Sequence, residues 1–385
     1  MQLQSYNRIQ LQEFIDSDFY KNLNKVPISY HRAVSHIHNP DVQDDDKLLW
    51  AAYSGERLVG YVGVLPAYIH VNQERKRIFW LSCFWVDENF RKENVASMLF
   101  FPLLKRYGKQ LLISNFLPNL EQMYQRLGVF NPTLYKLGTQ FYCKSCFGKI
   151  LPARFPRIGF LKPVFSFVDF LINSILCLFR KVFLPQRAQR NHKEYKLKYP
   201  YIQPFVPFVK TLCVLCGKNN IADNEFQDFL HSFYKDKNYV ERFAEHFDWI
   251  LNYPWVLQGK PDAESQRYYF SSKSEQFGYE AIKFFKDNKL TAFVLLKIRD
   301  QKLTLNYIFA DDDLIEDITA CIFNKVLTEN ISILTIYDNR VAHSIKKQRK
   351  HYLFSRCCRQ PFILPKTLNL TPDVFQEGDG DNVFT

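Results

Sequence analysis

Several features that would place a chain in a specialised class are missing from this sequence. The longest apolar block, residues 164–179, is shorter than the roughly 20 residues that cross a bilayer, and polar side chains lie in its middle. The first residues carry no basic flank followed by an apolar run, so we expect no secretory signal and a cytoplasmic location. Nine cysteines are spread over 385 residues without the spacing of a secreted disulfide framework, which predicts reduced thiols.

The bulk composition is that of a globular protein. Apolar residues make up 47% and charged residues 23%, and a chain of 385 residues exceeds one comfortable hydrophobic core, so we expect two domains. The formal net charge of +12 favours an anionic partner, which is a phosphorylated cofactor, a membrane surface or a nucleic acid. Charge alone does not choose among these three.

Two cysteine pairs have the spacing of zinc ligands. These are Cys143 with Cys146 and Cys213 with Cys216. If the segment around the second pair is a strand, residues three apart face opposite sides of a sheet and cannot converge on one ion. We therefore predict buried or surface thiols and no metal.

Hydrophobic periodicity predicts a series of strands and helices in the first third of the chain. Two apolar runs within 47–64, separated by Ser54-Gly55-Glu56-Arg57, predict a hairpin, and a third run ends at Val86. Helical spacing follows from Val95, then another strand over 110–116, then a helix that stops at Gly128. A mixed helical region over 11–33 precedes the hairpin and would cap one side of the sheet.

A similar series recurs over 281–339, with a polar turn at 286–289, a helix over 314–327 and a strand after it. Two copies of one α/β (α+β) unit explain this order better than two unrelated domains. We place the first domain at 1–143, a basic and apolar linker at 144–199, and the second domain at 200–385.

The linker contains an amphipathic helix over 164–179. Polar residues, including Ser166, Asp169 and Asn173, form a narrow stripe, and Phe, Leu and Ile cover the remainder. One interpretation is an interdomain helix buried between the two units. The other is an interfacial helix whose basic flanks meet anionic lipid, which would place the protein peripherally at the inner face of the membrane.

The residues from Val86 to Ala96 suit a turn that binds a pyrophosphate. An apolar strand ends at Val86, a short polar loop follows, and a helix begins near Asn94. Backbone N–H groups at such a helix start, together with the helix dipole, stabilise negative charge. An ordinary strand-to-helix turn with solvated charges is the alternative.

This stretch resembles the acetyl-CoA loop of the GNAT (Gcn5-related) N-acetyltransferases. The family has a strand-end Val, then an Arg or Gln, then x-x-Gly-x-Gly or Ala, and Arg91 and Ala96 match this pattern. Asn94 stands where the family usually has Gly; Asn tolerates the left-handed backbone, although its bulk restricts the approach of the pyrophosphate. Downstream, Tyr124 and Gly128 resemble the family's Tyr-x-x-x-Gly. The resemblance covers about 45–140, with a weaker echo over 275–345.

The resemblance implies an acyl-CoA-dependent transferase built from two GNAT-like units, each with a mixed, mostly antiparallel sheet flanked by helices. The thioester of acetyl-CoA would be attacked directly by an amine acceptor, with Tyr124 protonating the departing thiolate and Glu88 as the candidate base. Backbone amides near the strand end would bind the developing oxyanion. The expected cofactor-binding residues are Trp85, Val86, Arg91, Lys92, Asn94, Val95, Ala96, Ser97 and Asn119.

The base is not unique in the sequence. Asp87 lies in the loop beside Glu88, and His31, His36 and His38 cluster in one short segment that could lie over the acceptor site. In the family water often relays the proton, so a single base is not required.

The second copy differs at the corresponding turn, which reads Asp311-Asp312-Asp313 and would repel a pyrophosphate. It should not bind CoA. The acceptor would be an amino sugar or a lipid-linked intermediate, and no nucleic acid is expected. The alternatives are a Fem-like aminoacyl-tRNA-dependent transferase, whose basic surface would serve the tRNA, and a binding scaffold without activity.

Overall fold

The computed structural model describes residues 1–183, 212–216, 221–348 and 352–385. The chain forms two compact units, and each draws on separate stretches of sequence. The first unit consists of 1–136, 217–277 and 359–385, and the second of 137–216 and 278–358. This division differs from the expected order of domain, linker and domain, because the chain passes from one unit to the other four times. The expected boundary at 199/200 lies outside the described residues.

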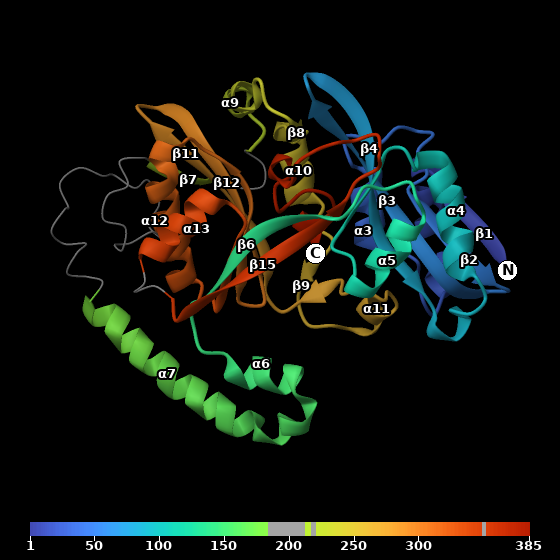
Figure 1. Ribbon diagram of the computed structural model, residues 1–385. Coiled ribbons are helices and arrows are strands. Elements are labelled where there is room, and N and C mark those ends of the chain that lie inside the picture. Colours follow the sequence, from blue (N-terminus) through green and yellow to red (C-terminus); the bar gives the residue numbers. More distant parts are fainter. Residues whose placement is uncertain (184–211, 217–220, 349–351) are drawn as a thin grey trace. The chain divides into compact units, whose positions relative to one another are not determined.

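The first unit is built on a sheet whose strands follow the predicted order (Figure 1). Its main strands are β1 (Gln2–Tyr6), β2 (Leu49–Ser54), β3 (Arg57–Val71), β4 (Glu74–Val86) and β5 (Leu111–Ser114). The first four pair in antiparallel fashion, whereas β5 runs parallel to β4. The end of β15 (Phe354–Ile363) pairs with β5, and the short β8 (Tyr239–Val240) pairs with β3.

Helices cover both faces of this sheet. Alternate residues of β2 point to opposite faces, so that Leu49, Ala51 and Tyr53 share a core with the N-terminal helices, while Trp50 and Ala52 pack with α4. The N-terminal helices are α1 (Arg8–Asp16), α2 (Asp18–Asn22) and α3 (Tyr30–Ile37). The opposite face carries α4 (Val95–Tyr107) and α5 (Pro118–Arg126).

The stretch 221–277 adds to the first unit a set of elements that the sequence did not predict. It contains α9 (Asn224–Tyr234), α10 (Ala244–Asn252), α11 (Ala263–Gln266) and the short parallel strands β9 (Leu257–Gln258) and β10 (Lys273–Ser274). Residues near the C-terminal end of the sequence, including Val383 and Phe384, are also buried in this unit.

The second unit repeats the same plan. It comprises β7 (Leu212–Cys216), β11 (Phe277–Lys286), β12 (Lys289–Arg299), β13 (Lys302–Phe309), α12 (Ile315–Thr328), β14 (Ile333–Ile336) and α13 (Asn339–Lys347). As in the first unit, the strand after the first helix is parallel to the strand before it, here β14 to β13. The predicted repeat and α+β class are confirmed.

The outer strand of each series was not foreseen. β6 (Leu134–Tyr142) follows α5 in sequence but pairs with β14, and β15 follows α13 but pairs with β5. Both pairings are antiparallel. Because they join residues far apart in sequence, no local pattern could reveal them.

The two cysteine pairs with the spacing of zinc ligands lie in different elements. Cys213 and Cys216 belong to strand β7, so the condition under which residues three apart face opposite sides of a sheet is met. Cys143 is buried directly after β6, whereas Cys146 precedes α6 (Phe147–Arg154).

The predicted amphipathic helix is longer than expected. It is α7 (Lys162–Phe183), and it packs against α6 after the 3-10 turn η2 (Pro156–Leu161) (Figure 1). Among the described residues, the stretch Pro156–Leu176 is long and apolar enough by composition to cross a membrane, with mean hydropathy 1.5 and no part of it buried. The stretch that meets these criteria begins eight residues before the predicted block 164–179, and both the interdomain and the membrane interpretation stay predictions.

Candidate functional site

Strand β4 contains a bulge near its end. Gly63 of β3 pairs with Ser82, but Tyr61 pairs with Trp85, so Cys83 and Phe84 together face a single residue of β3. Cys83 has a φ of 50°, a left-handed conformation that a residue other than glycine adopts only at a cost of order 1 kcal/mol. A bulge of this kind redirects backbone groups out of the regular ladder.

Beyond the bulge, β4 separates from its parallel neighbour. The pairing of β4 with β5 covers Phe79–Leu81, and β5 then pairs with the end of β15 through Ser114 and Phe362. The residues of β4 that follow Leu81 therefore lie at an opening between the carboxyl ends of two parallel strands. Openings of this type are common ligand sites in sheets with parallel strands, because backbone N–H groups are exposed there.

The turn that follows β4 is held by Asp87. Its carboxylate accepts hydrogen bonds from the Asn89 backbone (3.0 Å) and from Arg57 (2.9 Å), and these contacts lower its pKa, the Asn89 bond most strongly. A carboxylate with these partners and a lowered pKa is a weak base. Asp87 therefore shapes the turn and is a poor proton acceptor.

Asn94 adopts the backbone conformation that the family's glycine provides. Its φ is 57° and its ψ is 18°, and it directly precedes α4 without a side-chain cap. The amide of Met98 is bonded to the Asn94 carbonyl, so the amides of the first helical residues, Val95 to Ser97, lie at the open end of the helix. No acidic side chain lies in this first turn.

Tight packing fixes the start of α4 on the sheet. A Cβ added at Gly60 of β3 would lie 2.8 Å from a methyl of Val95 and 3.0 Å from Leu99. A side chain at position 60 would therefore push the helix start away from the strand. Because Gly60 has no side chain, α4 packs close to β3, and this packing sets the distance between the turn and the opening in the sheet.

The remaining charged residues of the turn are exposed. Glu88 and Arg91 form an ion pair at 3.0 Å, with side-chain exposures of 80% and 63%. This position leaves Arg91 and Lys92 available to an anionic ligand at the surface. The exposure of Glu88 favours a surface role for this residue, because a general base works best where water is limited.

Tyr124 of α5 lies in the core that faces α4. Its ring packs against Phe100 and Phe116, and its hydroxyl makes no hydrogen bond within the described residues. Burial raises its pKa above the ordinary value, so the phenol stays protonated at neutral pH. It therefore has the protonation state that an acid needs. Asn119 lies in the first turn of the same helix.

The opposite face of the β4 bulge carries a buried polar cluster that the sequence did not predict. The Arg32 guanidinium of α3 donates to the Ser82 hydroxyl (2.5 Å), to the Tyr268 hydroxyl (3.0 Å) and to the Cys83 thiol. Ser82 in turn donates to the Asp381 carboxylate at 3.1 Å. These contacts connect residues from 50 to 299 positions apart, and their only signal in sequence is an arginine among the residues that α3 buries.

Of the three clustered histidines, His36 is the one with unused ring nitrogens. It lies one turn after Arg32, is fully buried, and neither ring nitrogen has a hydrogen-bond partner. Burial places its pKa well below the ordinary 6.5, and the charge of Arg32 acts in the same direction, so it is neutral at pH 7. His31 bonds to the Trp255 carbonyl and His38 to the Val34 carbonyl.

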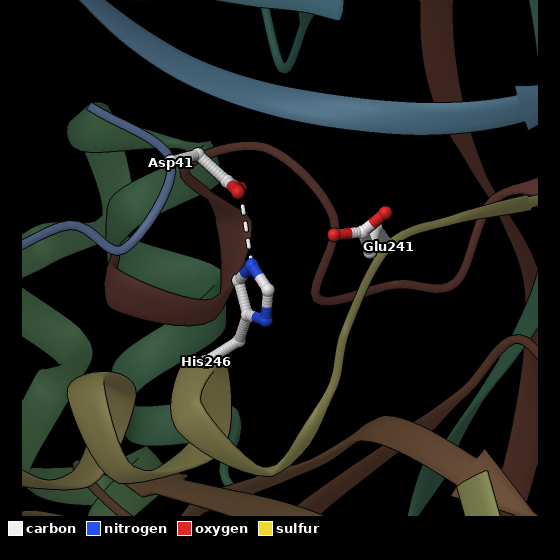
Figure 2. Close-up of side chains that lie close together, drawn as sticks. All are labelled: Asp41, Glu241 and His246. Carbon is white, nitrogen blue, oxygen red and sulfur yellow. Dashed lines mark hydrogen bonds and ion pairs between the residues drawn. The ribbon is translucent and has the colours of Figure 1, made fainter. Parts of the chain in front are cut away.

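A second buried cluster, Asp41, Glu241 and His246, has atoms close enough to hold a metal ion (Figure 2). The contacts indicate a different role. His246 Nδ1 accepts the Phe243 backbone N–H, so its proton is on Nε2 and is donated to Asp41 at 3.1 Å. Glu241 accepts two hydrogen bonds from Arg75, at 2.7 and 2.8 Å. The cluster thus binds the 221–277 stretch to the strands of the first unit.

The corresponding turn of the second unit is acidic. Asp311–Asp313 precede α12, whose own first turn adds Glu316 and Asp317. Arg340 of α13 ion-pairs with Asp312 (3.0 Å) and Asp338 (2.8 Å). A pyrophosphate would meet carboxylates at this turn.

An opening in a mixed sheet, followed by a left-handed residue and a helix start without a side-chain cap, suits an anionic group such as a pyrophosphate. Residues 9–129 match the model of the acetyltransferase (GNAT) family, so this part of the chain belongs to that family. The family uses an acyl-CoA as its co-substrate and an amine as acceptor. No curated protein sequence matches the chain.

Solved structures resemble this chain at low sequence identity. A conserved protein of unknown function from Enterococcus faecalis V583, described as a probable N-acyltransferase, is 9% identical with a TM-score of 0.50, and the match covers 94% of this chain and 72% of that one. Saccharomyces cerevisiae N-myristoyltransferase is 11% identical with a TM-score of 0.48, covering 96% and 80%. At these identities the first match supports the fold alone.

Proposed function

We propose that the first unit transfers an acetyl group from acetyl-CoA to the nitrogen of an amine. The observation that carries this proposal is the turn after β4, where Asn94 adopts the left-handed conformation and the amides of Val95, Ala96 and Ser97 begin a helix whose first turn has no acidic side chain. These amides would hold the pyrophosphate, with Arg91 and Lys92 adding positive charge. Trp85, Val86 and Asn119 are the further residues that we propose to contact the cofactor.

Acetyl transfer forms a C–N bond and breaks a C–S bond, while the amine loses one proton and the departing thiolate gains one. The neutral amine nitrogen attacks the thioester carbonyl, and the oxyanion that forms is stabilised by backbone amides near the end of β4. The C–S bond then breaks, and Tyr124 donates a proton to the departing thiolate. The amine loses its proton to a water or to His36, which is neutral and has both ring nitrogens unused.

Binding of the cofactor is tested by thermal unfolding with and without acetyl-CoA. A ligand that binds only the native state raises the melting temperature, by an amount that grows with its concentration. We expect a rise with acetyl-CoA and a smaller one with adenosine alone. An unchanged melting temperature at millimolar acetyl-CoA would contradict the proposal.

We also propose that α6 and α7 hold the protein at an anionic membrane surface, on the cytoplasmic side. The polar stripe of α7 faces α6: Asp169 accepts from the backbone of Phe147 and Gly148 at 2.8 Å, and Asn173 bonds to Ser145. The apolar side is left outward, with Phe167 and Phe170 61% and 66% exposed. Arg154, Arg157 and Lys162 flank it.

Co-sedimentation with anionic liposomes tests this second proposal. Burying a few exposed Phe and Leu side chains, each worth about 1.5 to 3 kcal/mol, would exceed a modest ordering cost. We expect Phe167→Glu with Phe170→Glu to release the protein from the pellet. Phe19→Glu, an exposed apolar position on α2, is the matched control and should sediment like the wild type. Wild-type protein that stays in the supernatant would contradict the proposal.

A further inference from the structure

A cavity of about 410 Å³ lies in the first unit against the last residues of β4. One wall is formed by Tyr61 of β3 and Trp85 of β4, the residue that precedes Val86 at the strand end. The other wall is the 261–273 segment around α11, from which the Tyr269 ring lies 5.5 Å from the Trp85 ring. The cavity is on the sheet face opposite α4, because Tyr61 and Trp85 pack with the N-terminal helices.

The charge of the cavity wall is positive. Three cationic side chains line it and no carboxylate does. Two of them are already paired, Arg267 with Glu264 at 2.7 Å and Lys273 with Asp262 at 2.5 Å. The third, Lys25, makes no ion pair within the described residues, and its ammonium lies 5.7 Å from the centre of the Trp85 ring. A free cation at the wall is therefore available to an anionic group.

The remainder of the wall is aromatic, with one unused polar group. Tyr268, Tyr269 and Phe270 line the cavity opposite Tyr61. The Tyr61 side chain is 1% exposed, and its hydroxyl makes no hydrogen bond of normal geometry within the described part of the chain. Burial raises the pKa of this phenol well above its ordinary value, so the group is a hydrogen-bond donor. Apolar walls with a few polar groups, at this volume, are typical of small-molecule sites.

We infer that the acceptor is a small amine with a flat apolar body and an anionic group, bound between these rings with its anion at Lys25. This inference rests on the proposed acetyl transfer, since the amine would reach the thioester at the end of β4 beside Trp85. The anion would form a charge-assisted hydrogen bond with Lys25. A polycationic acceptor is disfavoured, because the wall offers no carboxylate to compensate its charges.

Matched pairs of amines test the inference on the full-length chain. Tryptophan is compared with tryptamine, and glucosamine 6-phosphate with glucosamine, while spermidine represents polycations. Calorimetry measures the dissociation constant of each. We expect the member that carries the carboxylate or phosphate, in at least one pair, to bind about tenfold more tightly than its counterpart without that group. Lys25→Gln should remove this preference and Lys25→Arg should keep it, whereas Lys109→Gln, an exposed lysine outside the cavity, should change nothing.

The inference would be overturned by equal binding within both pairs, by a preference that survives in Lys25→Gln, or by no binding of either amine that carries the carboxylate or phosphate at about 10 mM. A change in acyl-chain preference in Lys25→Gln, without a change in amine binding, would assign the cavity to the acyl group and also overturn it. Titration of the same samples with acetyl-CoA separates the two proposals. Loss of acetyl-CoA binding contradicts the proposed function, whereas intact acetyl-CoA binding without the anionic preference contradicts this inference alone.

Discussion

The turn between β4 and α4 and the turn between β13 and α12 occupy the same place in two similar series of elements, yet they differ in charge. The first has Asn94 in the left-handed region and a first helical turn without acids. The second has Asp312 and Asp313 before the helix and Glu316 and Asp317 within it. One fold thus provides a helix start that suits an anion in one unit and a helix start that repels one in the other.

The second helices after these turns, α5 and α13, also differ between the two units. The seventh residue of α5 is Tyr124, a buried phenol whose pKa is raised by burial, whereas the seventh residue of α13 is Ile345, fully buried. The second unit therefore lacks a counterpart of both the proposed anion-binding turn and the proposed proton donor. We therefore propose a structural role for the second unit and place the acetyl transfer in the first unit.

The largest expected effect on kcat comes from removing the Tyr124 hydroxyl of α5, a group that the second unit lacks at the same position of α13. Tyr124→Phe removes the proposed acid while the ring stays packed, so kcat should fall about a hundredfold or more. The dissociation constant of acetyl-CoA should stay within about twofold of wild type. Steady-state kinetics and calorimetry measure the two quantities. Unchanged kcat at saturating substrate would assign Tyr124 to packing.

A pH effect is expected from His36. A base acts only when neutral, and burial places the pKa of His36 below 6.5, so kcat should be flat near pH 7 and fall as pH drops through the lowered pKa. His36→Gln should lower kcat about tenfold to a hundredfold and abolish this acidic limb. The pH profiles of wild type and variant check the prediction. Identical profiles would leave water as the proton acceptor.

A smaller effect is expected from moving the charge of the second turn into the first. Ala96→Asp places a carboxylate at the start of α4, where it would repel the pyrophosphate and weaken acetyl-CoA binding about tenfold. Ala96→Ser is the neutral control. The reciprocal change, Asp313→Ala in the second unit, should leave affinity unchanged, and an increase in the number of bound acetyl-CoA molecules there would break the comparison.

The smallest effect is expected at Asn94. Asn94→Gly keeps the left-handed backbone, removes a side chain from the phosphate approach, and should stabilise the fold by about 0.5 to 1 kcal/mol without weakening acetyl-CoA binding. Urea unfolding and calorimetry measure both effects, with Asn94→Ala as the strained control. A tenfold loss of affinity in Asn94→Gly would identify the Asn side chain as a ligand.

Local patterns in the sequence predicted much of the fold. The hairpin turn at Ser54–Arg57, the helix that begins at Val95 and the left-handed conformation at Asn94 all lie within a few residues of the signals that indicate them. The repeat was also visible, because strand and helix periodicities recur in the same order over 281–339.

Contacts between distant segments could not be predicted. The pairing of β6 with β14 and of β15 with β5, and the cluster of Arg32 with Ser82 and Tyr268, depend on residues about 50 to more than 200 positions apart. Nothing in a helix containing Arg32 indicates which strand it covers. The partner of the polar stripe of α7 could not be predicted for the same reason, since Asp169 accepts hydrogen bonds from the backbone of Phe147 and Gly148 in α6.

The central claim is that one unit binds the cofactor and the other does not. Calorimetric titration of the full-length chain with acetyl-CoA tests it most directly. We expect one acetyl-CoA site per chain, whose affinity is weakened by Ala96→Asp and unaffected by Asp313→Ala. Two equivalent sites, or a single site whose affinity changes with Asp313→Ala and not with Ala96→Asp, would contradict it.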